Sequence, residues 1–193
     1  QCMVERRQGG ETGVVSVQCL EGDAVWQARD KGLWSAELAT AACDAIQKKP
    51  EGQMEEHVKD PAVFLVEYAD GLKTATLMLS GYVSDFSYAA RVDGQVQGVE
   101  FYLQNEGPFS HFGYLCRNVQ DFFRTKKAPY PPERTLLTTG IIDAAMNSRH
   151  EDHRKIETPY LNVAYSSYDK LPQRPIGTRP VGASIDPQAP DII

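Results

Sequence analysis

The sequence predicts an α+β fold: an open, mainly antiparallel β-sheet with helices packed on one face. Two Asp-Gly pairs, at 70–71 and 93–94, each separate two runs of alternating apolar residues. Such a pair is a strong hairpin signal, because the central residues of a tight turn need positive φ. Amphipathic helical patterns follow these strands as a block and do not alternate with them. The 193 residues, 41% of them hydrophobic, suit one domain with a sizeable core.

Residues 1–7 and 13–20 are predicted to form a β-hairpin around two glycines, because apolar and polar positions alternate on both sides of that turn. Opposed strands place Cys2 across from Cys19, so the two thiols either form a disulfide or, as is commoner, stay reduced. The four cysteines have no Cys-x-x-Cys spacing. We therefore expect neither a zinc site nor a thioredoxin-like motif from the cysteines.

An alanine-rich helix is predicted over residues 37–46, with Ser35 before it and Pro50 after it. The polar stretch 51–60 is predicted to be a loop. The most regular part of the sequence is 62–105, in which the two Asp-Gly turns join pairs of alternating runs. We expect four consecutive antiparallel strands there.

Two helices and a short strand complete the predicted domain, which covers residues 1–168. After Pro108, apolar residues recur at spacings of three and four, which indicates a helix that lies on the sheet. A proline-rich break ends it, and Pro132 suits the first turn of a second helix. A last strand is expected at 161–165. Residues 169–193 are rich in proline and are predicted to form an extended tail.

The other face of the sheet is predicted to be free of helices. It would contain Tyr68, Thr74, Thr76, Tyr88 and Tyr102. Because broad aromatic or apolar faces usually mark interfaces, we expect this open face to pair with a second copy of the chain. The alternative is a sheet that curls and covers itself.

Composition and motifs exclude several function classes. The net charge is -6 and no basic cluster exceeds two lysines, so nucleic acid is not an expected partner. No stretch approaches the roughly 20 apolar residues of a membrane helix. A glycine-rich phosphate loop, a P-loop and a nucleophile elbow are all absent from the sequence.

Few residues have the type and position of a ligand-binding group. Arg6 and Arg7 lie near Glu5 and Glu11 and form either an ion-pair network or a site for an anionic substrate or phosphate. His111 is expected in the first turn of a helix beside a sheet edge. We take Arg6, Arg7 and His111 as the candidate substrate-binding residues, and we identify no catalytic residue.

Two histidines raise the question of a metal site. His150 and His153 are three residues apart in a charged run at the end of a predicted helix. Solvated surface is the ordinary interpretation of such a run, and a metal site is the alternative. Ser110 precedes a predicted helix and is interpreted as its N-cap and not as a nucleophile.

Four stretches carry a family resemblance. Residues 3–7 read Met-Val-Glu-Arg-Arg and residues 9–14 read Gly-Gly-Glu-Thr-Gly-Val. Residues 64–71 read Phe-Leu-Val-Glu-Tyr-Ala-Asp-Gly, and residues 130–140 read Tyr-Pro-Pro-Glu-Arg-Thr-Leu-Leu-Thr-Thr-Gly. Over about residues 1–165 the chain resembles the C-terminal domain of a bacterial branch of the Gfo/Idh/MocA oxidoreductases, the family of glucose-fructose oxidoreductase and inositol dehydrogenase.

The resemblance implies a two-domain enzyme. An N-terminal Rossmann domain would bind NAD or NADP, and the C-terminal α+β domain would enclose a sugar or polyol derivative and pair subunits. The chain opens inside a predicted strand and lacks the Glu-Lys-Pro and Asp-x-x-x-His motifs of the family. We therefore expect it to be only the second domain, with no cofactor of its own and no turnover alone. The alternative is an autonomous binding or scaffold domain for a glycan or protein partner.

Overall fold

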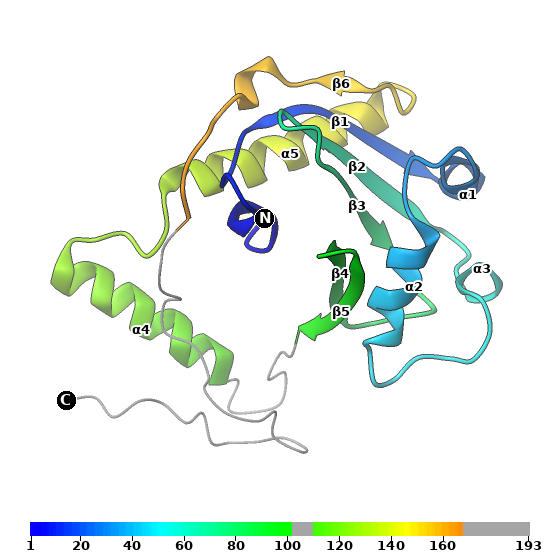
Figure 1. The fold of residues 1–193 in the computed structure, drawn as a ribbon, viewed down its shortest axis with the longest axis horizontal. Coiled ribbons are helices and arrows are strands. Elements are labelled where there is room, and N and C mark those ends of the chain that lie inside the picture. The colour runs from blue at the N-terminus through cyan, green and yellow to red at the C-terminus, as the bar shows by residue number, and fades with distance from the viewer. Residues whose placement is uncertain (102–109, 168–193) are drawn as a thin grey trace.

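The computed structural model of the protein describes residues 1–101 and 110–167, apart from the side chains of 110 and 111. These residues form a mixed α/β fold with antiparallel strands, which confirms the coarse prediction (Figure 1). The elements in chain order are η1 (Val4–Arg6), β1 (Val14–Glu21), α1 (Asp23–Asp30), α2 (Ala36–Asp44), α3 (Met54–His57), β2 (Ala62–Tyr68), β3 (Lys73–Met78), β4 (Phe86–Val92), β5 (Gln95–Phe101), α4 (Ser110–Thr125), α5 (Pro132–His150), β6 (Ile156–Glu157) and η2 (Pro159–Leu161).

The strands form two sheets and not one meander. The larger sheet has the order β3-β2-β1-β6, and β4 pairs only with β5 in the second sheet. Both Asp-Gly hairpins are present, as predicted, between β2 and β3 and between β4 and β5. At the second turn both residues have positive φ, 49° for Asp93 and 78° for Gly94. After β3 the chain turns at Gly81, where a Cβ atom would lie 2.8 Å from the carbonyl oxygen of His57. This turn separates the two hairpins.

Helices contribute to cores on both sides of β2, so the prediction of one helix-covered face was wrong. Val63 and Val66 are three positions apart on a strand and point to opposite faces. Val63 belongs to a first core with side chains from α1, α2 and α3. Val66 belongs to a second core with Leu137 and Ala144 of α5. The short α1 and α3 help to build the unexpected side, and α3 lies in the stretch 51–60 that was predicted to be a loop.

The predicted N-terminal hairpin is also wrong. Residues 4–6 form η1, and β1 takes β2 and β6 as its neighbours. Cys2 is exposed and Cys19 is buried, and both are free thiols. The alternation of residues 1–7 therefore does not reflect strand pairing. Instead, Glu5 and Arg7 in this segment are used in a polar network described below.

The predicted helices are present, with one correction. In α2, the backbone N–H of Leu38 donates to the Ser35 hydroxyl at 3.2 Å, so Ser35 is the N-cap. Pro132 opens α5 as predicted. However, α4 does not lie on a sheet: it stands apart from both (Figure 1), and its Leu115 and Phe123 are exposed. Helical periodicity predicts that a helix has an apolar face. It does not predict which element covers that face.

The end of the described chain differs in detail from the prediction. The last strand is β6, and residues 161–165 contribute only an isolated bridge between Tyr165 and Glu11. No helix among the described residues is long and apolar enough to cross a membrane. The predictions for residues 169–193 and for Tyr102 lie outside the described residues.

Candidate functional site

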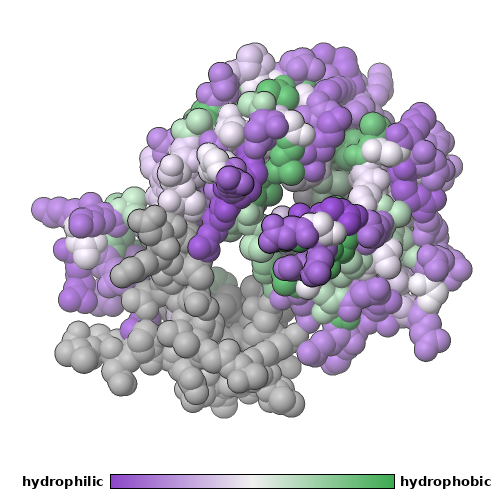
Figure 2. Space-filling view, viewed as in Figure 1, coloured by the Kyte–Doolittle hydropathy of each residue, from purple (hydrophilic) through white to green (hydrophobic). Residues whose placement is uncertain are grey.

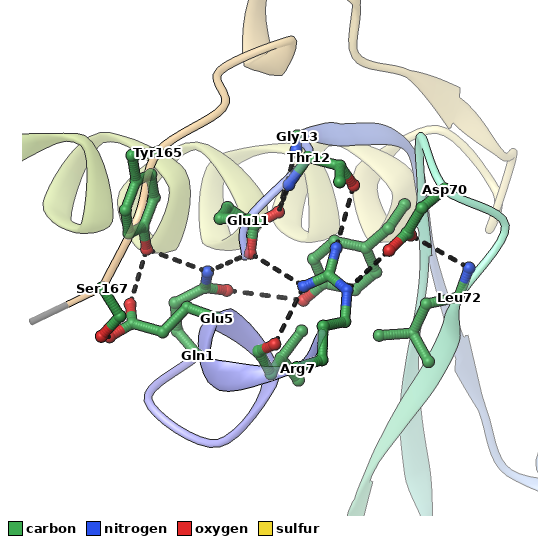
Figure 3. A network of polar contacts seen from close by, with 12 residues as sticks. Gln1, Glu5, Arg7, Glu11, Thr12, Gly13, Asp70, Leu72, Tyr165 and Ser167 are labelled. Carbon is green, nitrogen blue, oxygen red and sulfur yellow. Dashed lines mark hydrogen bonds and ion pairs between the residues drawn. The ribbon is translucent and has the colours of Figure 1, made fainter. Parts of the chain in front are cut away.

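A buried network of charged side chains joins the N-terminal segment to the sheet (Figure 3). It also joins this segment to α5. Its first centre is Glu5, which is fully buried. Arg134 donates two hydrogen bonds to the Glu5 carboxylate, one of them from Nε at 2.9 Å. The hydroxyls of Tyr165 and Ser167 donate at 2.6 and 2.8 Å. The Arg134 guanidinium also lies over the ring of Tyr130, 4.5 Å from its centroid.

The second centre of the network is Arg7. Its Nε donates to Asp70 at 2.6 Å, its Nη2 to the Thr12 hydroxyl at 2.9 Å and its Nη1 to the Val4 carbonyl at 2.9 Å. The guanidinium also lies over the ring of Tyr68, 5.0 Å from the centroid. Every nitrogen of this side chain therefore has a partner within the chain.

Glu11 links the two centres. One carboxylate oxygen accepts the backbone N–H groups of Thr12 and Gly13, each at 2.9 Å. The other accepts Gln1 Nε2 at 2.5 Å and lies 3.5 Å from Arg7 Nη1. The Gln1 amide also donates to the Tyr165 hydroxyl at 3.1 Å, so one side chain connects the Glu11 carboxylate to the Glu5 cluster.

The electrostatics of the network favour stable ion pairs over acid–base chemistry. Burial on its own raises the pKa of Glu5, but the hydrogen bonds from Arg134, Tyr165 and Ser167 outweigh it and leave the pKa below its usual value. A general acid or base needs a pKa near the working pH. Burial lowers the pKa of Arg7, but Asp70 and Glu11 more than compensate and raise it. The geometry is that of paired charges, and we call the network of Glu5, Arg7, Glu11, Asp70 and Arg134 the clamp.

The structure shows where the residues of the charged N-terminal cluster lie. Arg7, a candidate substrate-binding residue, is held by the carboxylates of Glu11 and Asp70. It belongs to an ion-pair network, as the first interpretation proposed. Arg6 is exposed at the end of η1. His111 lies in the first turn of α4, far along the chain, and its side chain is outside the described residues.

The stretches that carry the family resemblance meet in this network. Residues 3–7 supply Glu5 and Arg7, residues 9–14 supply Glu11, and residues 64–71 and 130–140 supply Asp70 and Arg134. Stretches more than 100 positions apart in the sequence therefore serve one structural unit.

Sequence reasoning missed Arg134, Asp70 and Tyr165 as members of the network. One signal was present: Arg134 lies in the first turn of α5, where the helix dipole favours negative side chains. A cation in that position suggests that a nearby carboxylate holds it. Asp70 had been assigned to its hairpin turn, and nothing in the sequence pairs it with Arg7.

The residues that were predicted to form one open aromatic face lie in two different sheets. Tyr68 is buried in the second core, and Thr74 lies on the same side because it is opposite Val66. Thr76 follows Thr74 by two positions and shares that face, which α5 partly covers. Tyr88 lies on β4, in the other sheet.

An apolar face is nevertheless exposed on the β4–β5 sheet. Phe86 is opposite Phe101, and Tyr88 is opposite Val99, so their side chains share one face. Phe86 is 65% exposed, Phe101 is 40% exposed and Val99 is 42% exposed. Figure 2 shows hydrophilic residues over most of the rim of the molecule and apolar residues around the central hollow beside these strands.

The two histidines considered for a metal site are separated by the structure. His150 is exposed at the end of α5. His153 turns back onto β1, where its Nδ1 lies 3.1 Å from the carbonyl oxygen of Cys19.

No protein-family model, curated protein or solved structure matches this chain in the three comparisons made.

Proposed function

We propose that this chain is the substrate-enclosing and oligomerisation domain of an NAD(P)-dependent oxidoreductase that acts on sugar or polyol derivatives, with the nucleotide bound by a separate domain. The class of enzyme comes from the family resemblance. The observation that carries the role in subunit pairing is the exposed apolar face of the β4–β5 sheet.

The two faces of the β4–β5 sheet are different. On one face α2 packs so closely that a Cβ atom at Gly98 would collide with the carbonyl of Ala41. Arg91 on this face forms an ion pair with Glu37 of α2. The opposite face carries Phe86 and its neighbours and is not covered by α2. Aromatic side chains are enriched in the cores of protein interfaces, so we assign this face to contact with a second copy of the chain.

The test of this proposal is the oligomeric state in solution. Sedimentation velocity over a concentration series should show reversible self-association of the chain. The double substitution Phe86→Ser/Phe101→Ser should weaken it by at least about tenfold, which corresponds to roughly 1.4 kcal/mol. The control is Phe123→Ser on α4, which removes a still more exposed aromatic ring from another surface.

A chain that stays monomeric at the highest concentration would contradict the pairing role. The enzyme class is tested separately on the natural full-length polypeptide. We expect NAD(P)-dependent oxidation of polyols by that polypeptide, followed by absorbance of the reduced cofactor. If the natural protein neither binds a nicotinamide nucleotide nor oxidises polyols, the autonomous binding or scaffold domain becomes the better interpretation.

A further inference from the structure

We propose that Cys19, Glu21 and His153 form a binding site for one zinc ion. Cys19 and Glu21 are two positions apart on β1 and therefore point to the same face of the strand. His153 comes from the turn after α5, more than 130 positions later. The Cys19 sulfur, a Glu21 carboxylate oxygen and an imidazole nitrogen all lie within 4.8 Å of one another.

The separation of these atoms is close to what zinc requires. Metal–ligand distances of about 2.0–2.3 Å in a tetrahedral site place neighbouring ligand atoms roughly 3.3–3.8 Å apart. The three groups therefore need to move inward by about 1 Å or less. Cys19 is buried, whereas Glu21 and His153 are half-buried, so an ion can enter from the surface.

A hydrogen bond to the backbone of β1 fixes which imidazole nitrogen of His153 is available to an ion. A carbonyl oxygen can only accept, so the 3.1 Å contact with the Cys19 carbonyl places the proton on Nδ1. Nε2 then carries the free lone pair. Metal-binding histidines commonly donate their second nitrogen to a carbonyl or carboxylate in this way.

The turn that presents His153 is itself unusual. Asp152 and His153 have φ values of 51° and 64°, a conformation that residues other than glycine rarely adopt. It is maintained by the His153 N–H, which donates to the Ser148 carbonyl at 2.8 Å, and by Gln18 Nε2, which donates to the His153 carbonyl at 2.8 Å. These bonds orient the imidazole toward β1 in the absence of an ion.

The set of donors selects the metal. Thiolate and imidazole suit zinc and related transition metals, whereas magnesium and calcium prefer oxygen ligands. One thiolate and one carboxylate balance the charge of a divalent ion. Three protein ligands leave a fourth position for water, the arrangement of an open zinc site.

A reactive cysteine is a poorer explanation of the same cluster. Burial, and then the negative charge of Glu21, raise the pKa of the Cys19 thiol, although Arg149 opposes the shift. Nucleophilic cysteines have a lowered pKa.

Arg149 Nε donates to Glu21 at 2.9 Å, and this ion pair competes with a metal for the carboxylate.

The experiment uses the chain with its two exposed thiols removed, Cys2→Ser/Cys116→Ser, after treatment with a chelator. Titration with Co²⁺ should saturate at one equivalent, with a thiolate-to-cobalt charge-transfer band, and Zn²⁺ should displace the cobalt. Cys19→Ser should abolish that band. His153→Asn, which keeps a residue tolerant of positive φ, should weaken binding by more than the roughly 10- to 100-fold that loss of an outer partner costs.

Three further variants sharpen the test. His150→Asn makes the same change outside the cluster and should leave binding unaltered. Arg149→Gln frees Glu21 and should tighten binding. If circular dichroism shows that Cys19→Ser does not fold, metal binding by His153→Asn and Glu21→Gln tests the proposed site instead. A parent protein that binds neither ion, or binding that survives both of these substitutions unchanged, would overturn the proposal. The proposed enzyme class is unaffected by either outcome.

Discussion

Glu5 is a carboxylate with no exposed surface, and Arg134 is its main charged partner. An ion pair of this kind is sensitive to the loss of one member, because the remaining charge stays buried. Removing one member therefore lowers the free energy of unfolding by much more than the intact pair contributes on balance.

We expect Arg134→Met to lower the free energy of unfolding by about 3–5 kcal/mol. The matched control is Arg154→Met, which breaks the exposed pair with Glu151 and should cost less than about 1 kcal/mol. Urea unfolding followed by circular dichroism measures both. Equal losses in the two variants would mean that the Glu5 pair is not a buried one.

The pKa of Glu67 leads to a second prediction at the scale of single residues, on how the stability of the fold depends on pH. A hydrogen bond from Lys155 is the main cause that lowers its pKa from 4.5 to about 2, with burial opposing and Ser16 and Lys73 assisting. Between these values the unfolded chain binds the proton and the folded chain does not. The contribution of Glu67 is therefore complete above about pH 4.5 and is lost as the pH falls toward about 2.

Glu67→Gln should flatten the decrease in stability over this acid range, relative to the parent. Lys155→Met should shift the loss to higher pH, since it removes the group that lowers the pKa most. Unfolding free energies measured in urea at half-unit steps of pH provide the test. Identical pH profiles for the parent and both variants would rule out this role.

Elements depend on a few positions where the backbone approaches another segment. Gly13 starts the path into β1 with a φ of 94°. A Cβ atom there would lie 2.8 Å from the backbone nitrogen of Val163 and 2.9 Å from the carbonyl oxygen of Leu161. Gly9 has nearly the same φ, 92°, but no atom within 4 Å of such a Cβ.

The two glycines form a matched pair. Gly9→Ala should cost about 1–2 kcal/mol, the strain of a left-handed alanine. Gly13→Ala adds a collision with backbone and should cost roughly 1–3 kcal/mol more. Chemical denaturation of both variants gives the difference. A Gly13→Ala variant no less stable than Gly9→Ala would show that the η2 segment moves aside without cost.

At the scale of the whole molecule, the described residues form a body with two cores, one on each side of β2. The N-terminal segment and the residues before 167 are fastened to this body by the clamp. The apolar face of β4–β5 and the helix α4 lie outside both cores.

A prediction at this scale concerns the nicotinamide nucleotide. Calorimetric titration of this chain with NAD and NADP should give no saturable heat, because the proposed function assigns the cofactor to another domain. A polypeptide that also contains the proposed nucleotide-binding domain would be the positive control. Micromolar binding to the chain alone would contradict that assignment.

Local patterns accounted for much of the secondary structure. Asp-Gly turns indicated both hairpins, and Ser35 and Pro132 indicated the starts of two helices. The patterns failed at residues 1–7, where alternation came from Glu5 and Arg7 reaching partners in distant segments. Alternation of apolar and polar residues predicts a strand only when the polar side chains face water.

The sequence by itself determined the α+β class, the hairpins and the charged N-terminal cluster, because each depends on neighbours within a few positions. Only the tertiary structure decided that α5 covers one side of β2 and three short helices the other. It also decided that Arg134 and Asp70 complete the clamp and that His153 reaches Cys19 and Glu21. These pairings join residues 60 to 135 positions apart, and local periodicity carries no information about which distant surface a side chain meets.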